Sequence, residues 1–300
     1  MAAGKPRLWF SARERAGYTF LLPWAIGFLG LSVGPMLWSL YLSFTNFDLL
    51  TSPKWVGASN YVRMFSSDPK FLTSMRVTFS FVLFSVPLKL AFALGVALLL
   101  NRGIRGLSLY RAMFYLPSLL GASVAVAILW RQLFAGNGLV NKFLAIFGIE
   151  GPSWISNPSY SLWTLVALSV WQFGSPMIVF LAGLRQIPAD VYEAASIDGA
   201  GKVRQFLRIT LPLLTPVIFF NAIIQTIDAF KSFTPAFIIS GGMGNPVNST
   251  LFYTLYLYQE AFGFFRMGYA SALAWVLLLL ISSFTAFAFL TSRYWVHYDE

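Results

Sequence analysis

Apolar stretches alternate with short polar segments along the whole chain. Six of these stretches are long enough to cross a bilayer, whose hydrocarbon core is spanned by about 20 helical residues. They cover residues 19–44, 77–100, 110–133, 162–184, 213–239 and 269–289. Backbone groups in lipid must find hydrogen bonds within their own segment, so each stretch is predicted to be an α-helix. The pattern therefore predicts an all-α membrane protein: a tail over residues 1–17, then one domain of six transmembrane helices over residues 18–300.

Composition and charge narrow the class of protein further. Of the 300 residues, 57% are hydrophobic and only 11% are charged, which is far from the composition of soluble globular domains. The net charge of +10 is not concentrated in a soluble region where basic and stacking aromatic residues cluster, so nucleic acid is not an expected partner. The chain has no cysteine and a single histidine, His297. We therefore expect no metal and no cofactor on this chain.

Basic residues predict which ends of the spans face the cytoplasm. Four regions hold more than half of the 21 Lys and Arg residues: the N-terminal tail, the turn between spans two and three, the segment between spans four and five, and the stretch after span six. Loops rich in Lys and Arg stay on the cytoplasmic side of a membrane. Both termini and the segment between spans four and five are therefore expected in the cytoplasm.

That segment, residues 185–212, is the longest polar interruption in the second half of the chain. Asp190 occupies an N-cap position, and Glu193 follows three residues later, as in a capping box. These signals predict a helix of about two turns over residues 191–197, with Gly199 as its left-handed C-terminal residue. A second short helix with a basic and an apolar side follows it. The segment is predicted to form a helical hairpin on the cytoplasmic face.

The same segment carries a resemblance to a known family. The residues that carry it are Glu193, Ala194 and Ala195, then Gly199, and then Ile209, Leu211 and Pro212. Together they resemble the signature cytoplasmic loop of membrane subunits of binding-protein-dependent ABC importers. The whole hydrophobic pattern resembles the carbohydrate-uptake branch, in particular the larger-type permease of maltose, glycerol-phosphate and alginate importers. The resemblance implies that the short helix is a coupling helix that docks on a separate ATPase, with Glu193 as its polar anchor.

The resemblance also implies a set of partners and a location in the bacterial inner membrane. They are a second homologous permease subunit, a dimer of ATPase subunits that binds ATP and Mg²⁺, an external solute-binding protein, and a sugar as cargo. The binding protein is expected to deliver the cargo to the loops around Trp55 and Leu251. The chain itself has no glycine-rich phosphate loop and no constellation of catalytic residues. It is therefore expected to be a pore subunit and not an enzyme.

Polar residues inside the spans are candidates for the substrate path. The fifth span places four of them on one helical face: Asn221, Gln225, Asp228 and Ser232. Gln172 in the fourth span, beside a predicted kink at residues 174–176, and Trp275 in the sixth span add further candidates. Amides, hydroxyls and aromatic rings suit a sugar, because sugars are bound by many hydrogen bonds and by stacking. The alternative is that these groups hydrogen-bond between helices.

Lys231 and Asp228 allow two interpretations. Their i+3 spacing permits an ion pair that neutralises both side chains and serves the structure. Alternatively, Lys231 and Lys89 of the second span supply positive potential to a path for an acidic sugar such as an alginate oligosaccharide. An ion-coupled secondary transporter is the competing class of protein. It typically shows internal repeats and relays of ionisable groups within the membrane, and the sequence offers one charge pair and no repeat.

Overall fold

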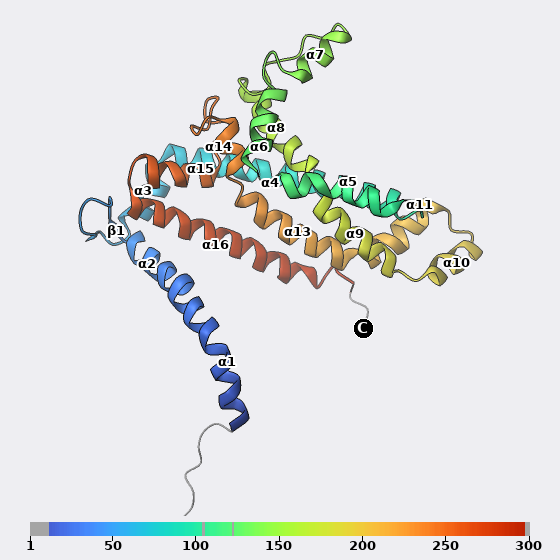
Figure 1. Cartoon of the computed structure of the whole chain (residues 1–300), viewed down its shortest axis with the longest axis horizontal. Coiled ribbons are helices and arrows are strands. Elements are labelled where there is room, and N and C mark those ends of the chain that lie inside the picture. The colour runs from blue at the N-terminus through green and yellow to red at the C-terminus, as the bar shows by residue number, and fades with distance from the viewer. Residues whose placement is uncertain (1–11, 104–105, 122, 298–300) are drawn as a thin grey trace, which may run out of the picture.

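The computed structural model describes residues 12–103, 106–121 and 123–297, so residues 1–11 of the predicted tail lie outside the described part. The described chain is almost entirely helical. Four helices are long and apolar enough to cross a membrane, and two bent helix pairs raise the number of candidate spans to six. The long helices lie side by side in Figure 1, with α10 and α11 at one end of the bundle and α3 and β1 at the other. This arrangement agrees with the predicted all-α class.

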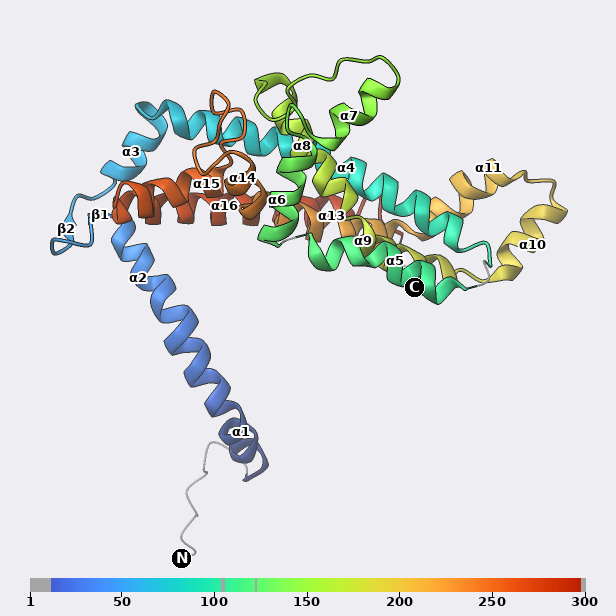
Figure 2. The same ribbon diagram turned by 45° about the horizontal axis from the view of Figure 1, so that its top comes forward.

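The first span stands apart from the bundle. It consists of α1 (Ala12–Phe28), the π-helical turn η1 (Leu29–Val33) and α2 (Gly34–Ser43). Only α2 packs on the bundle, against α16 (Met267–Ser292), while α1 projects away from it (Figures 1 and 2). No residue in the most apolar 18-residue part of this span is buried, and Leu42 and Ser43 at its end are buried. The first span therefore offers nearly its whole surface to lipid or to another protein.

A small ordered cap follows the first span. The strands β1 (Thr45–Asn46) and β2 (Lys54–Trp55) pair antiparallel, with Thr45 opposite Trp55, and α3 (Ser59–Ser66) closes the loop. Asn60 donates its side-chain amide to the carbonyls of Ser43 and Thr45, at 2.8 and 2.9 Å. These contacts make the loop after the first span a compact cap on the end of the bundle.

The second span, α4 (Pro69–Leu100), forms the centre of the bundle. It begins at Pro69 and not at residue 77, because Asp68 caps it by accepting hydrogen bonds from the amides of Lys70 and Phe71. One cluster of buried side chains joins α4 to α15 (Tyr253–Tyr258), with Phe71 and Tyr253 fully buried. A second cluster joins the other half of α4 to α9 (Gly174–Gln186). Helix α4 therefore holds the two halves of the bundle together.

The third span is broken, which corrects the prediction of one continuous helix over residues 110–133. Helix α5 (Leu107–Leu120) and helix α6 (Val124–Leu133) meet at 95°. Pro117 weakens the last turn of α5, and Ser123 starts α6 by accepting a hydrogen bond from the amide of Val126. Ala122, between the two helices, lies outside the described residues. The break redirects the chain into the projecting hairpin that contains α7 (Leu139–Ile146).

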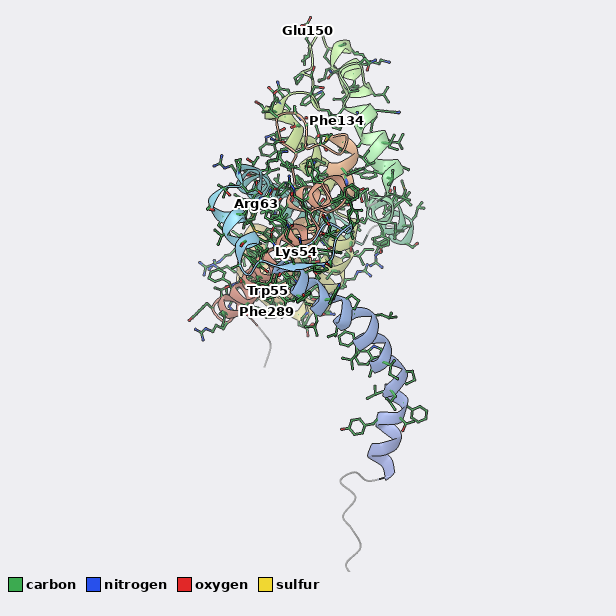
Figure 3. The ribbon with its side chains drawn as sticks, turned by 90° about the vertical axis from the view of Figure 1, so that its left-hand side faces the viewer. Lys54, Trp55, Arg63, Phe134, Glu150 and Phe289 are labelled. Atoms are coloured by element: carbon green, nitrogen blue, oxygen red, sulfur yellow. The ribbon has the colours of Figure 1, made fainter. Side chains whose placement is uncertain are left out.

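The fourth span is bent as predicted. Helix α8 (Pro158–Trp171) meets α9 at 43°, and the kink predicted at residues 174–176 lies at the start of α9. The hairpin between α6 and α8 rises above the bundle, with Glu150 near its tip (Figure 3). The remaining elements are α10 (Ala189–Ile197), α11 (Lys202–Gln205), η2 (Phe206–Thr210), α12 (Leu211–Leu213), α13 (Thr215–Phe230), α14 (Thr234–Ile239) and η3 (Gln259–Gly263).

Candidate functional site

A polar cavity lies inside the bundle, where four spans meet. It has a narrow part of about 90 Å³ and an adjoining wider part of about 500 Å³. The two parts share Lys89 of α4, Gln172 between α8 and α9, Gln225 and Asp228 of α13, and Ser232 and Pro235. Lys231, Ser118 and Ser175 line the wider part. An amide, hydroxyl and charged lining is costly within an apolar bundle, so these residues are candidates for a functional site.

Three helix breaks converge on this cavity. Span three is broken at Gly121, span four at Gln172, and span five between α13 and α14, where Lys231 and Ser232 lie. Irregular backbone within a membrane domain needs hydrogen-bond partners from protein or water, so it is tolerated where it is buried in protein or lines a polar cavity. Broken helices also line the substrate sites of many transporters. The position of the breaks therefore supports the cavity as the functional centre of the bundle.

Direct hydrogen bonds join the breaks of spans three and four. The side-chain amide of Gln172 donates to the carbonyl of Gly121 at 3.1 Å, and the Ser118 hydroxyl donates to the carbonyl of Gln172 at 2.9 Å. The backbone amide of Ser175 in turn donates to the Ser118 hydroxyl at 3.0 Å. Each bond satisfies a backbone group that a broken helix leaves unpaired. The two bends are thus mutually dependent, and together they form one wall of the cavity.

The charged groups of the cavity are arranged differently from the predicted ion pair. In the described part of the chain, Asp228 and Lys231 form no ion pair, because α13 ends at Phe230 and Lys231 caps it outside the helical face. The predicted ion pair between Asp228 and Lys231 is therefore not formed. Lys89, from α4, lines the same cavity as Asp228. Lys89 and Lys231 both reach the cavity, and Asp228 is the one carboxylate among its lining residues.

The structure brings together most of the predicted path residues. Five of the predicted candidates line the cavity: Gln172, Gln225, Asp228, Lys231 and Ser232. Asn221 is buried one turn further along α13, and its side-chain nitrogen has no hydrogen-bond partner among the described residues. Neither Asn221 nor Trp275 of α16 lines the cavity. Contact with substrate stays a prediction for all of these residues.

Sequence reasoning missed Ser118, Ser169 and Thr234 as lining residues. Ser169 precedes Gln172 by three residues, so helical periodicity alone places it on the same face. Ser118 carries no such signal, because it reaches the cavity only through the bend of span three.

The segment 185–212 forms the predicted helical hairpin, with one local correction. Helix α10 begins at Ala189 with Pro188 at the N-cap, so Asp190 lies in the first turn and the predicted capping box of Asp190 and Glu193 does not form. The C-terminal end is as predicted, with Gly199 at a φ of +77°. The amide of Gly199 donates to the carbonyl of Ser196, and the amide of Ala200 donates to that of Ala195, which is a Schellman motif.

Side-chain hydrogen bonds fix the two arms of this hairpin. Gln205 donates to the Ser196 hydroxyl at 2.8 Å and to the carbonyl of Ala200 at 3.0 Å. The hydroxyls of Tyr192 and Thr210 share a hydrogen bond of 2.9 Å. Outside this framework, Glu193 and Ala194 are exposed. The hairpin is therefore rigid and presents its outer surface to solvent.

That outer surface is apolar and basic at the same time. Ile197 is 87% exposed and Val203 is 73% exposed, at the end of the bundle where α10 and α11 lie (Figure 1). A shallow hollow of about 690 Å³ beside them is lined by Val203, Leu207 and the basic residues Lys202, Arg204 and Arg208. Exposed apolar residues rimmed by charge are typical of a protein-binding surface.

A helical bundle with a polar cavity and an exposed α10 hairpin is the arrangement of a transport permease. Comparison with known proteins identifies the class of permease. Residues 71–295 match the family model of the binding-protein-dependent transport system inner membrane component. The chain therefore belongs to this family, and it is an ABC transporter permease related to sugar permeases. Membership places it with binding-protein-dependent systems and not with ion-coupled carriers.

The relatives are ABC transporter permeases, and several of them belong to sugar-transport systems. The chain is 55% identical to the probable ABC transporter permease protein YesP of Bacillus subtilis (strain 168), over 95% of this chain and 93% of that protein. It is 33% identical to the lactose transport system permease protein LacF of Rhizobium radiobacter, over 92% and 94%. It is 32% identical to the trehalose/maltose transport system permease protein MalF of Thermococcus litoralis, over 90% and 91%.

Two solved structures share the fold. One is a chain of a bacterial ABC transporter involved in the import of the acidic polysaccharide alginate, with a TM-score of 0.74 and 22% identity over 94% of this chain and 96% of that chain. The other is a chain of the bacterial alginate ABC transporter in complex with an alginate pentasaccharide-bound periplasmic protein, with a TM-score of 0.79 and 21% identity over 94% and 95%. At this level of identity the likeness establishes the fold.

Proposed function

We propose that this chain is one of two pore-forming permease subunits of an ATP-driven importer that carries a sugar or oligosaccharide across the bacterial inner membrane. The main support is the cavity, in which three helix breaks bring Gln172, Gln225 and Ser232 together. Fans of amide and hydroxyl hydrogen bonds are what a sugar requires. In this proposal both termini and the α10 hairpin face the cytoplasm, and six spans cross the membrane.

The cargo in this proposal is an acidic oligosaccharide. The cavity lining contains two lysines, Lys89 and Lys231, and one aspartate, Asp228. The positive excess favours a cargo that carries carboxylates, because charges within a low-dielectric bundle interact strongly. The solved transporters that share this fold include one involved in the import of the acidic polysaccharide alginate, which belongs to this class of cargo.

Energy enters through the α10 hairpin. Closure of an ATPase dimer would push α10, and α9 and α13, which flank the hairpin, would transmit this movement to the cavity between them. The docking surface in this proposal is the exposed apolar set around Ile197, with Glu193 as a polar anchor. ATP and Mg²⁺ belong to that ATPase, since this chain has no phosphate-binding loop.

The remaining partners are assigned to two further surfaces. The exposed first span, α1 to α2, is proposed to pack on the second permease subunit, because an all-round apolar helix gains close packing from a neighbour of similar kind. The opposite end of the bundle, with the cap around Trp55 and the loop that leads to Leu251, is proposed to receive the external solute-binding protein.

The assembled importer in proteoliposomes tests this function. We expect ATP hydrolysis to be stimulated by an external binding protein loaded with an acidic oligosaccharide and much less by one loaded with a neutral sugar. The variant Lys231→Gln should reduce the stimulation by the acidic sugar severalfold, and Lys142→Gln, on the distant hairpin helix α7, serves as the control of equal charge change. If Lys231→Gln keeps the preference for the acidic over the neutral sugar, the assignment of an acidic cargo is wrong. If no sugar stimulates ATP hydrolysis, the assignment as a sugar importer is wrong.

The docking surface has its own test. Ile197→Asp should abolish stimulation while leaving the fold intact, because the side chain is 87% exposed. Ile146→Asp, on helix α7 and 76% exposed, is the matched control outside both assigned surfaces. Glu193→Ala should weaken coupling as well. Full stimulation in Ile197→Asp would mean that the ATPase docks on another surface.

A further inference from the structure

A second polar pocket lies at the end of the bundle opposite to the α10 hairpin. It has a volume of about 340 Å³ and is formed where α3, the start of α4, η3 and the start of α16 meet. Three basic side chains, Arg63, Lys70 and Arg266, line it together with two acidic ones, Asp68 and Glu260. We call it the basic pocket. It shares no lining residue with the cavity described above.

The two acidic residues of the basic pocket are already occupied. Asp68 accepts hydrogen bonds from the hydroxyls of Tyr256 and Tyr269, in addition to the two backbone amides that it caps. Glu260 is almost completely buried and pairs with Arg266, with 3.1 Å between Oε2 and Nη1. Neither carboxylate forms an ion pair with the other two cations, and three cations against two carboxylates leave the lining with a net charge of +1.

Arg63 and Lys70 consequently remain without an acidic partner in the described part of the chain. Both are exposed, and each lies against an aromatic ring: the guanidinium of Arg63 is 4.6 Å from the centre of the Tyr269 ring, and Nζ of Lys70 is 5.9 Å from that of Phe264. Aromatic faces hold cations in place without neutralising them. The pocket thus presents two positioned positive charges to an incoming anion.

The surroundings of the pocket indicate the source of that anion. Three phenylalanines beside it, Phe262, Phe264 and Phe265, expose more than half of their surface. Helices α4 and α16 begin at the pocket, and their apolar stretches start a few residues later, at 77 and 269, so the cations of the pocket lie just outside the hydrocarbon. Aromatic residues and cations at this level contact the headgroups of lipids. An acidic protein surface would match the charges but not the apolar rim.

We propose that the basic pocket binds the phosphate of an anionic phospholipid, with Arg63 as a forked donor and Lys70 as a point charge. The guanidinium matches the geometry of phosphate oxygens, and the ammonium adds charge. The acyl chains would lie along the exposed phenylalanines and the adjoining apolar surface. Figure 3 views this end of the bundle, with Arg63 on its outer face. The proposal is independent of the transported cargo.

Native mass spectrometry of the purified permease complex tests the proposal. We expect wild type to retain phosphatidylglycerol in preference to phosphatidylcholine. The double variant Arg63→Gln/Lys70→Gln should retain about tenfold less phosphatidylglycerol than wild type. The variant Lys54→Gln/Lys142→Gln removes the same charge from exposed positions outside the pocket and should retain the lipid as wild type does. Equal retention by all three proteins would overturn the proposal.

Two further arms separate the other sources of an anion. Inorganic phosphate added at millimolar concentration should leave the lipid bound, and displacement of the lipid by phosphate would mean that the pocket is a site for the free ion. If the double variant retains the lipid but loses affinity for the external binding protein, the pocket is a protein contact and the proposal is overturned. An unchanged unfolding temperature in both variants verifies that the fold is intact.

Discussion

Gly174, Gly121 and Gly95 differ in what an added methyl group would meet. A Cβ at Gly174 would lie 2.3 Å from the carbonyl oxygen of Phe114, which is backbone of α5 and cannot move alone. A Cβ at Gly121 would lie 2.2 Å from the side chain of Gln172, which can swing away. A Cβ at Gly95, within α4, would meet no atom within 4 Å. Substitution at Gly174 should therefore affect stability, substitution at Gly121 should affect mainly transport, and Gly95 serves as the control.

We expect Gly174→Ala to lower the free energy of unfolding by about 1–3 kcal/mol, because α5 and α9 must separate. Gly121→Ala should lower the free energy of unfolding by roughly 1 kcal/mol, because the hydrogen bond between Gln172 and the Gly121 carbonyl is lost. Its main effect should be a lower rate of transport, because Gln172 lines the cavity. Gly95→Ala is the control and should be unchanged. Thermal unfolding in detergent, followed by tryptophan fluorescence, measures the first effect. A neutral Gly174→Ala would contradict the close approach of the two helices.

Asp68 joins the start of α4 to α15 and α16 through a charged group. Burial raises the pKa of its carboxyl, but the hydroxyls of Tyr256 and Tyr269 and the amides of Phe71 and Lys70 outweigh burial, so the pKa lies below its ordinary value. A lowered pKa in the folded state stabilises the protein above the unfolded pKa, and this contribution is lost as the pH falls through the folded pKa.

We therefore expect Asp68→Asn to lower the free energy of unfolding at pH 7 by roughly 2 kcal/mol, through the weakened cap and the lost charged hydrogen bonds. The difference from wild type should shrink below about pH 4, where the carboxyl of the unfolded chain begins to be protonated, and shrink further as the pH falls through the lowered pKa of the folded state. Unfolding in denaturant between pH 3 and pH 7 measures both effects. Glu150→Gln, at the tip of the α7 hairpin, is the control. If the difference in unfolding free energy between wild type and Asp68→Asn does not change with pH, the charge of Asp68 does not stabilise the fold.

The α10 hairpin shows what a single backbone conformation contributes to an element. Gly199 has a φ of +77°, whereas Gly201, two residues later, has a φ of −66°, and neither has a neighbour within 4 Å of an added Cβ. Gly199→Ala should cost about 1 kcal/mol or somewhat more, because the left-handed conformation is unfavourable for alanine, and Gly201→Ala should cost nothing comparable. Hydrogen exchange of the Ala200 amide should be faster in Gly199→Ala alone. Equal exchange in the two variants would mean that the Schellman motif does not hold the hairpin.

Sequence reasoning predicts an element correctly where residues close together in the sequence determine its structure. Long apolar runs identify spans one, two, five and six, and Gly199 marks the end of α10 because few other residues adopt its conformation. It fails where contacts between elements decide. The bend of span three is held by Gln172, which is distant in sequence, and Asp228 and Lys231 form no ion pair because α13 ends at Phe230.

The whole molecule has a predicted orientation that its composition makes easy to test. Because the chain has no cysteine, single substitutions report one position each. Leu50→Cys and Val203→Cys, 90% and 73% exposed at opposite ends of the bundle, should fold normally. In spheroplasts, a membrane-impermeant maleimide should label Leu50→Cys directly and Val203→Cys only after permeabilisation. Labelling in the reverse order would invert the topology and remove the docking assignment.

The attachment of the first span has a consequence for biosynthesis. Its α2 half packs on α16, and the amide of Gly268 at the start of α16 bonds to the carbonyl of Phe47 at 3.1 Å, so the first span is anchored by the last one. A ribosome releases the first span long before the last is made. During that interval the first helix must persist in the bilayer as a single helix, which its uniformly apolar surface permits. The contacts of α2 with α16 therefore form only after the last span has been made, and a chain truncated before residue 267 keeps only the cap to hold that helix.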